Sequence, residues 1–353
     1  MSVVRELVER PCGWMGTNAP QREIVLSSRI RLARNLSERT FPQRADEPSR
    51  GVLLQEILDK TQHVEALGGG LRLNLERLEP VERQLLGERQ LISQDLVEKP
   101  QHRGVVVARD ESASFMINEE DHLRIQAMRP GLDLDQAYRA ADGLDDELDA
   151  RLDFAYSPRF GFLTACPTNT GTGMRASVLI HLPGVVLAKE SDKLLESLRK
   201  LHLTVRGFYG EGTAAMGNFF QISNAVTFGL REAEILEQLD RAAHSLIEWE
   251  QRAREALLRK ARPLLEDKIW RSYGILRYAR MLTSQEALTH GSLLRLGVGL
   301  KVLDDVPVET LNEILVQSRP AHAQLLAGRE GGAGERDAWR AEMVRNKLRR
   351  AER

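Results

Sequence analysis

The strongest constraint on the fold is a change of pattern near residue 230. Before it, strand-like segments arrive in pairs between helical ones; after it, the chain has helical periodicity and almost no strand signal. Paired strands favour an antiparallel sheet, because a parallel pair needs a long crossover between its strands. The sequence therefore predicts an α+β fold, with an antiparallel-dominated sheet flanked by helices and then an all-helical C-terminal domain. We place the two domains at 1–255 and 256–353.

The expected strands lie at 24–35, 71–78, 104–110, 112–118, 160–166, 202–210 and 219–229. A polar turn at Asp110 and Glu111 predicts a hairpin between the third and fourth of these strands. Helices are expected within 1–23, at 47–66 and 133–150, in 174–200 with a break near Pro183, and throughout the C-terminal domain.

Composition excludes several classes of protein. With 353 residues, 42% hydrophobic and 29% charged, the chain is long enough for about two domains and is not disordered. A formal net charge of −1 argues against direct binding to nucleic acid. No run approaches the ~18 to 20 apolar residues of a membrane span, and the N-terminus has no signal-peptide core. Its two cysteines provide neither a disulfide framework nor a zinc cage. We therefore expect a cytoplasmic protein with no membrane contact.

Five arginines occupy comparable contexts in loops or at the ends of elements. Arg29 and Arg31 are two residues apart and share one face of a strand. Arg124 follows an acidic run, Arg175 follows a Gly-Thr-Gly turn at the expected start of a helix, and Arg206 precedes a glycine. Guanidinium groups bind phosphate bidentately and remain charged, so together these residues could clamp a triphosphate. Taken singly, each is more often an ordinary surface arginine.

Two carboxylates lie in similar settings. Glu120 belongs to the run NEEDH at 118–122, and Glu211 stands between two glycines in FYGEG. Each could act in the same site as the arginines, or could simply form a salt bridge with them. No cluster of His, Cys and Asp offers a dedicated metal site.

Four separated motifs resemble the phosphagen kinases, the ATP:guanidino phosphotransferases. They are SSRIRLARN from residue 27, NEEDHLRIQ from 118, CPTNTGTGMRASV from 166 and RGFYGEG from 206, and the resemblance covers nearly the whole chain. Two features resemble the branch of that family that phosphorylates arginine in proteins. Only about two dozen residues precede SSRIR, and the last helix begins RDAWRA, which is similar to the RDxxRA motif of a phosphoarginine pocket. The resemblance implies a kinase that uses ATP, with Mg²⁺ bound mainly through the nucleotide.

The resemblance also implies roles for individual residues. It assigns the five arginines to the ATP phosphates, Glu120 and Glu211 to the substrate guanidinium, and Cys166 to a position close to the reacting group. The nucleotide contacts that it implies are Ser27, Ser28, Arg29, Ile30, Arg31, Gln90, Arg124, Arg175, Ala176, Ser177, Val178, Leu179, Arg206, Gly207, Phe208, Tyr209 and Gly210. Gln90 stands where the family has a histidine in EKHLIS. A glutamine can hydrogen-bond the nucleotide, but it cannot stack as an imidazole does or become cationic.

The C-terminal motif implies an allosteric pocket for phosphoarginine formed by Arg336, Asp337 and Arg340. The two arginines are four apart and project from one helical face, and a site with both charges matches an anionic phosphate joined to a guanidine. From the residues alone, an acid in the first turn of a helix with solvated arginines is the simpler interpretation.

The resemblance further implies a homodimer and protein substrates with exposed arginines. The implied partners are a heat-shock repressor, a zinc-binding activator protein and a Clp ATPase/protease, which would place the enzyme in a stress response that marks proteins for degradation. Two alternatives stay open, namely a kinase of a free guanidino metabolite and a non-catalytic phosphoarginine-binding adaptor. The acidic run 142–149 could steer basic clients or be a solvated helix.

Overall fold

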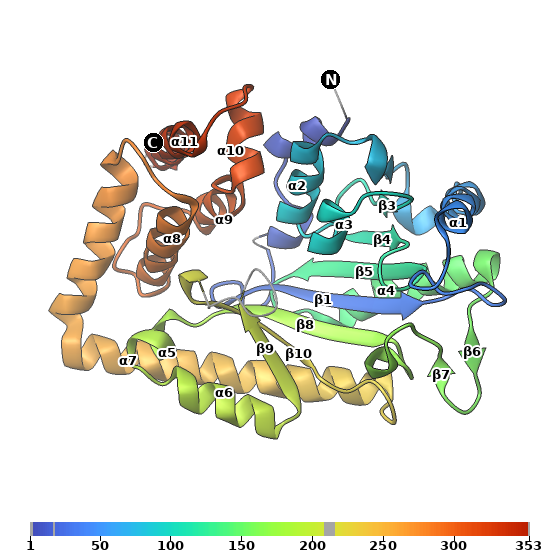
Figure 1. Ribbon diagram of the computed structural model, residues 1–353. Helices are drawn as coiled ribbons and strands as arrows, with labels where there is room; N and C mark the ends of the chain where they lie inside the picture. Colours follow the sequence, from blue (N-terminus) through green and yellow to red (C-terminus); the bar gives the residue numbers. More distant parts are fainter. Residues whose placement is uncertain (1–2, 17, 208–215, 352–353) are drawn as a thin grey trace.

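The computed structural model describes residues 3–16, 18–207 and 216–351. Its centre is an eight-stranded sheet in the order β2-β3-β4-β5-β1-β8-β10-β9, in which every neighbouring pair is antiparallel (Figure 1). The strands are β1 (Val25–Arg34), β2 (Leu71–Asn74), β3 (Gly104–Val107), β4 (Ala113–Ile117), β5 (Leu123–Pro130), β8 (Met174–His181), β9 (Leu203–Gly207) and β10 (Phe219–Asn224). A separate pair is formed by β6 (Tyr156–Ser157) and β7 (Gly161–Phe162). The α+β class is confirmed, as is the hairpin of β3 and β4.

The two faces of the sheet differ because successive side chains along a strand point to opposite sides. On one face, Ile30, Ile125, Val178 and Ile222 belong to a large buried cluster. This face is covered by α4 (Leu134–Leu152) and by the first half of α7 (Glu232–Tyr278). In Figure 1, α4 lies behind β1 and β5, and α7 runs below the sheet. The other face carries polar side chains in the middle of β1 and β8, and we call it the polar-centred face.

Three further helices lie in the first half of the chain. They are α1 (Glu47–Lys60), α2 (Pro80–Glu88) and α3 (Gln94–Glu98). At the N-terminus, Val3–Glu9 forms a short 3-10 helix within the segment expected to be helical. Its residues Val4 and Leu7 share a buried cluster with Leu85 of α2 and Val105 of β3, on the polar-centred side of the sheet.

The segment 174–200 corrects the sequence prediction. Instead of an interrupted helix it forms β8, followed by α5 (Pro183–Leu187) and α6 (Ser191–Lys200). Met174–His181 is a short apolar run that pairs with β1 on one side and β10 on the other, and most of it is buried. Periodicity alone cannot distinguish such a fully buried strand from a buried helix. Strand β5 was likewise not expected from the pattern.

The C-terminal region is helical, as predicted. It comprises the second half of α7, α8 (Ser284–Gly299), α9 (Val308–Gln317), α10 (Pro320–Ala327) and α11 (Ala333–Ala351). The expected domain boundary at 255/256 lies inside α7, shortly before a kink at Ala261 (φ −146°). Pro263 explains the kink, because a proline cannot donate to the carbonyl four residues earlier and its ring clashes there. None of the helices in the described part of the chain is long and apolar enough to cross a bilayer.

Candidate active site

The strand register places Arg29, Arg31 and Arg175 on the polar-centred face of the sheet. Arg31 of β1 lies directly opposite Arg175 of β8, and Arg29 follows two residues away on the same face. Cross-strand partners share a face, and so do residues two apart. Arg124 of β5 pairs with Ala33, the next β1 residue on this face, so it joins the same group.

Arg206 belongs to this face as well. It pairs with Gln221 of β10, which in turn pairs with Leu179 of β8. Leu179 is four residues from Arg175 on the same strand, an even spacing that keeps both side chains on one side. The structure thus brings all five predicted arginines to a single face of the sheet.

The arginine cluster concentrates several positive charges, and burial and mutual repulsion lower the pKa of two of its members. Burial, with the nearby charges of Arg175 and Arg124, lowers the pKa of Arg29 to about 10. Burial and the neighbouring arginines hold the pKa of Arg31 well below its ordinary value. Its Nε is buried with no hydrogen-bond partner among the described residues. A buried, unpaired guanidinium nitrogen is costly, so this face fits a ligand that brings several negative charges.

Neighbouring hydroxyl groups fix the orientation of Arg175. Its Nη2 donates to Thr204 Oγ1 at 3.1 Å and to Ser223 Oγ at 3.1 Å. Ser223 lies in β10, which pairs with β8, and Thr204 lies in β9, the next strand beyond. Arg175 therefore owes its position to the middle of a sheet. The prediction that a helix starts at Arg175 is wrong, because residue 175 lies in β8.

Glu120 lies in the turn between β4 and β5, beside the arginine cluster. Its Oε2 is 2.8 Å from Arg124 Nη2, and Glu119 contacts the same guanidinium through Nη1 at 2.9 Å. Although burial opposes it, the charge of these carboxylates raises the pKa of Arg124. The Glu120 side chain remains 34% exposed, so it can still meet a ligand, whereas that of Glu119 is only 7% exposed.

The loop that carries Cys166 packs against this acidic turn. Asn169 Nδ2 donates to Glu120 Oε2 at 3.4 Å, and the backbone N–H of Ala165 donates to Asp121 Oδ1 at 2.7 Å. Cys166 is partly exposed, with its Sγ 3.0 Å from Thr168 Oγ1. Sequence reasoning did not single out Asp121 or Asn169. Their places inside the NEEDH and CPTNT motifs were the available signal.

Gln90 reaches the arginine cluster from the end of α2. Its Oε1 accepts a hydrogen bond from Arg29 Nη1 at 3.1 Å. A small hollow opens here over the sheet. Its lining consists of Trp14, Ser27, Arg29, Gln90, Met128, Ser177, Leu179 and Gln221. The residue that departs from the family pattern therefore contacts one of the predicted phosphate ligands directly.

Some of the predicted nucleotide contacts point elsewhere. Ile30, Ala176 and Val178 are buried in the core on the opposite face. The Ser28 hydroxyl donates to the carbonyl of Gly131 at 2.9 Å. In the segments 27–31 and 175–179, only the odd-numbered side chains face the arginine cluster. Phe208, Tyr209, Gly210 and Glu211 lie outside the described residues.

The C-terminal motif is arranged around a buried arginine. Arg340 is 2% exposed and donates to the carbonyl of Leu282 at 2.6 Å, to the carbonyl of Ser318 and to Asp337 Oδ1 at 2.6 Å. Arg336 donates to the carbonyl of Gly331 at 2.7 Å. Since α11 begins at Ala333, Asp337 follows the first turn of the helix instead of lying in it.

A metal site built from protein side chains is not found in the described parts of the chain, where no three His, Cys, Asp or Glu residues converge. The cation-rich face fits an anionic nucleotide, and Mg²⁺ carried on such a nucleotide needs few protein ligands.

Comparison with known proteins gives consistent matches along the chain. Residues 54–253 match the C-terminal catalytic domain of the ATP:guanido phosphotransferases, and residues 262–353 match the C-terminal domain of the protein-arginine kinase McsB. The protein-arginine kinase of Pelotomaculum thermopropionicum is 46% identical over 95% of both chains. That of Bacillus subtilis is 39% identical over 99% of this chain and 96% of its own.

Solved structures agree with the sequence matches. A taurocyamine kinase from Schistosoma mansoni, determined with components of a transition-state analogue, aligns with a TM-score of 0.60 and 27% identity over 67% of this chain and 34% of its own. A lombricine kinase aligns with a TM-score of 0.56 and 25% identity over 69% of this chain and 70% of its own.

Proposed function

The chain belongs to the ATP:guanido phosphotransferase family, among its protein-arginine kinases, and from this membership we propose that it transfers the γ-phosphoryl group of ATP to arginine side chains in proteins. The observation that carries the proposal is the convergence of Arg29, Arg31, Arg124 and Arg175 on one sheet face beside the part-exposed carboxylate of Glu120.

The arginine cluster is the proposed site for the ATP phosphates. Fixed cations in a partly buried site neutralise the charge that develops on the transferring group, and they need little reorganisation to do so. Arg31 supplies an unused donor for a phosphate oxygen, and Arg175 is already oriented by Thr204 and Ser223. Mg²⁺ would be held by the phosphate oxygens and by water. When bound, it supplies further neutralisation of the phosphates.

Glu120 is the proposed acceptor of the proton. A guanidinium is a poor nucleophile because its lone pairs are delocalised and its pKa exceeds 12. As the N–P bond forms and the bond between the γ-phosphorus and the ADP oxygen breaks, one N–H proton must leave the attacking nitrogen. A positioned carboxylate accepts this proton and holds the planar group in line with the phosphorus. We assign the second carboxylate to Glu211 and a contact with the reacting group to Cys166.

The choice between a protein and a free metabolite as acceptor is open to direct test. The protein should be incubated with MgATP and either free arginine or an unfolded basic protein, then analysed by mass spectrometry under non-acidic handling. We expect N-phosphorylated arginine in the protein and little phosphorylation of the free amino acid. The reverse result would favour a metabolite kinase, and no transfer in a single-turnover assay would favour a binding adaptor.

We assign allosteric activation by phosphoarginine to the region of Arg336, Asp337 and Arg340. Arg340 already links three segments, so a ligand that competes for Asp337 or Arg340 would move all of them. Isothermal titration with free phosphoarginine should give binding to wild type and much weaker binding to Asp337→Ala. The matched control is Glu335→Ala, which removes an exposed acid two residues away on the same helix. Equal affinity in all three proteins would refute the assignment.

A homodimer is supported by large exposed apolar side chains on the second half of α7 and just beyond it. Leu264, Trp270, Tyr278 and Met281 are 68%, 53%, 69% and 58% exposed. Several exposed large apolar side chains in one region are typical of an association surface. Sedimentation should report a dimer that Trp270→Glu converts to a monomer. A wild-type monomer would contradict this part of the proposal.

The wider cellular role completes the proposal. It comprises a cytoplasmic location, a stress response, delivery of phosphorylated clients to a Clp ATPase/protease, and binding to a heat-shock repressor and a zinc-binding activator protein. Co-purification of these partners from stressed cells, with and without the Glu120→Gln variant, tests it.

A further inference from the structure

Glu88, the last residue of α2, is buried at the junction between α2 and α10. Its carboxylate accepts hydrogen bonds from the backbone N–H groups of Ala321 at 2.9 Å and His322 at 3.1 Å, and its Oε2 lies 2.8 Å from His322 Nδ1. The side chains of Glu88 and His322 are both fully buried. The first N–H groups of a helix have no partner within it, so this carboxylate completes the start of α10.

The two residues after Glu88 lead directly to the arginine cluster. Arg89 forms a buried ion pair with Glu111, at 2.5 Å between Nη2 and Oε1. Gln90 has a left-handed backbone conformation (φ 64°), and its side-chain oxygen accepts a hydrogen bond from Arg29. Its carbonyl accepts from Gln126 Nε2 at 2.8 Å. The segment 88–90 is therefore fixed at one end to α10 and at the other to Arg29.

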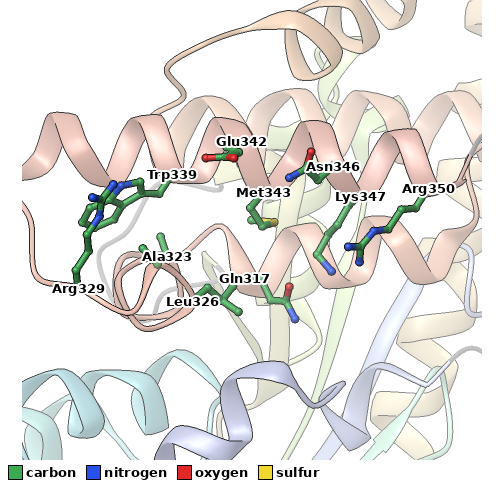
Figure 2. Close-up of a pocket in the computed structure, with 11 residues that line it drawn as sticks. Gln317, Ala323, Leu326, Arg329, Trp339, Glu342, Met343, Asn346, Lys347 and Arg350 are labelled. Atoms are coloured by element: carbon green, nitrogen blue, oxygen red, sulfur yellow. The ribbon is translucent and has the colours of Figure 1, made fainter.

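The segment that Glu88 holds is also held from the C-terminal side. Arg340 of α11 donates to the carbonyl of Ser318, just before α10, and Arg319 Nη1 donates back to the carbonyl of Glu88 at 3.1 Å. Farther along, one side of α10 borders an open groove of about 600 Å³. In Figure 2, Ala323 and Leu326 border this groove opposite Trp339 and Met343 of α11. The hydrogen bonds near residues 318–322 thus attach the start of α10 to α2 and α11.

We propose that Glu88 is a positioning residue for the nucleotide: it ties α10 to the segment 88–90, and through Gln90 it orients Arg29 toward the phosphates. The proposal rests on the ATP site described above. It makes nucleotide affinity depend on the placement of 318–322, a segment far from the site in sequence. A purely structural role for Glu88 would affect stability without acting through Gln90.

The first test is the Glu88→Gln variant, measured by isothermal titration with MgADP and by steady-state kinetics. The amide keeps the shape of the carboxylate but loses its charge and one acceptor oxygen. We expect roughly tenfold weaker MgADP binding and a similar rise in KM for ATP, the loss expected for one displaced charge-assisted hydrogen bond. The kcat should change by less than about threefold. Glu98→Gln, the same exchange at an exposed site of α3, should match wild type.

The second test combines Glu88→Gln with Gln90→Ala. Once Gln90 no longer reaches Arg29, the Glu88 exchange should cause little further loss of affinity. A full additional tenfold loss in the Gln90→Ala background would overturn the proposal, as would an unchanged affinity in the wild-type background. If wild type itself fails to bind MgADP, the proposed ATP site is wrong, which is a different result.

A second pair of variants covers the case in which Glu88→Gln does not fold. His322→Asn keeps a donor near the position of Nδ1, whereas His322→Leu removes it. We expect the asparagine variant to bind MgADP as wild type does and the leucine variant to bind more weakly. Equal affinities of two folded variants would overturn the proposal.

Discussion

Replacing Glu120 by glutamine separates the chemistry of the site from its architecture. The amide has the size of the carboxylate and can still accept a hydrogen bond from Asn169, which contacts Glu120 Oε2 at 3.4 Å. It can neither take up the proton from the attacking nitrogen nor attract the substrate cation. Loss of a positioned acid–base group lowers a rate by at least roughly 100-fold, equivalent to about 2.7 kcal/mol of transition-state stabilisation.

The stability of the protein should hardly change in this variant. Arg124 is not left unpaired, because Glu119 still contacts its Nη1 at 2.9 Å. The lost pair joins side chains that are 17% and 34% exposed, so we expect a cost of no more than about 1 kcal/mol. A small change in unfolding free energy with a large fall in turnover would identify a catalytic effect.

The matched control is Glu119→Gln, one residue away. It also removes one carboxylate from Arg124 but leaves Glu120 in place. Single-turnover transfer from MgATP to an unfolded basic protein measures both variants, and titration with MgADP checks that the nucleotide still binds. If the two variants lost the same activity, the effect would come from misplacing Arg124. Turnover of Glu120→Gln within about fivefold of wild type would refute the assignment.

Three further outcomes are expected from buried groups. Asp145→Ala should lower the unfolding free energy in urea by about 3 to 5 kcal/mol, because the Arg34 side chain, 3% exposed, then loses its buried partner. Iodoacetamide at pH 8 should modify Cys166 but not Cys12 in the native protein, as read by peptide mass spectrometry, since burial raises the pKa of Cys12 to about 12. Burial and nearby arginines hold the pKa of His181 well below 6.5 in the folded protein. As the pH falls, His181 therefore binds a proton in the unfolded chain before it does so in the folded protein. Between pH 7.5 and 5.5, wild type should therefore lose about 1.4 kcal/mol more stability than His181→Gln. The first prediction is contradicted if Asp145→Ala lowers the unfolding free energy by less than this, and the second if native Cys12 is alkylated. The third is contradicted if the stability of wild type and His181→Gln changes equally with pH.

The motifs on single elements could be interpreted from the sequence. The two-residue spacing of Arg29 and Arg31 put both on one face of a strand, and the structure confirms this. The helical periodicity after residue 230 correctly predicted an all-helical region. Both inferences depend only on local geometry, which a short stretch of sequence specifies.

The boundaries and partners that depend on distant residues could not be obtained in this way. Residues 174–181 were expected to be helical, yet they form a central strand because β1 and β10 pair with them on either side. The contact of Gln90 with Arg29 spans 61 positions, and no local pattern indicates it. No local pattern in the sequence indicates that Arg340 is buried against the carbonyls of Leu282 and Ser318.

The sequence alone determined which side chains alternate along each strand, where helices dominate and which motifs carry charge, since these follow from the covalent spacing of neighbours. Only the tertiary structure decided that five arginines from four strands share one face, and that α10 is bonded to the segment leading to Arg29. Strand pairing and burial are long-range contacts whose free energy depends on residues far apart in the chain. They become defined only when the whole chain has folded.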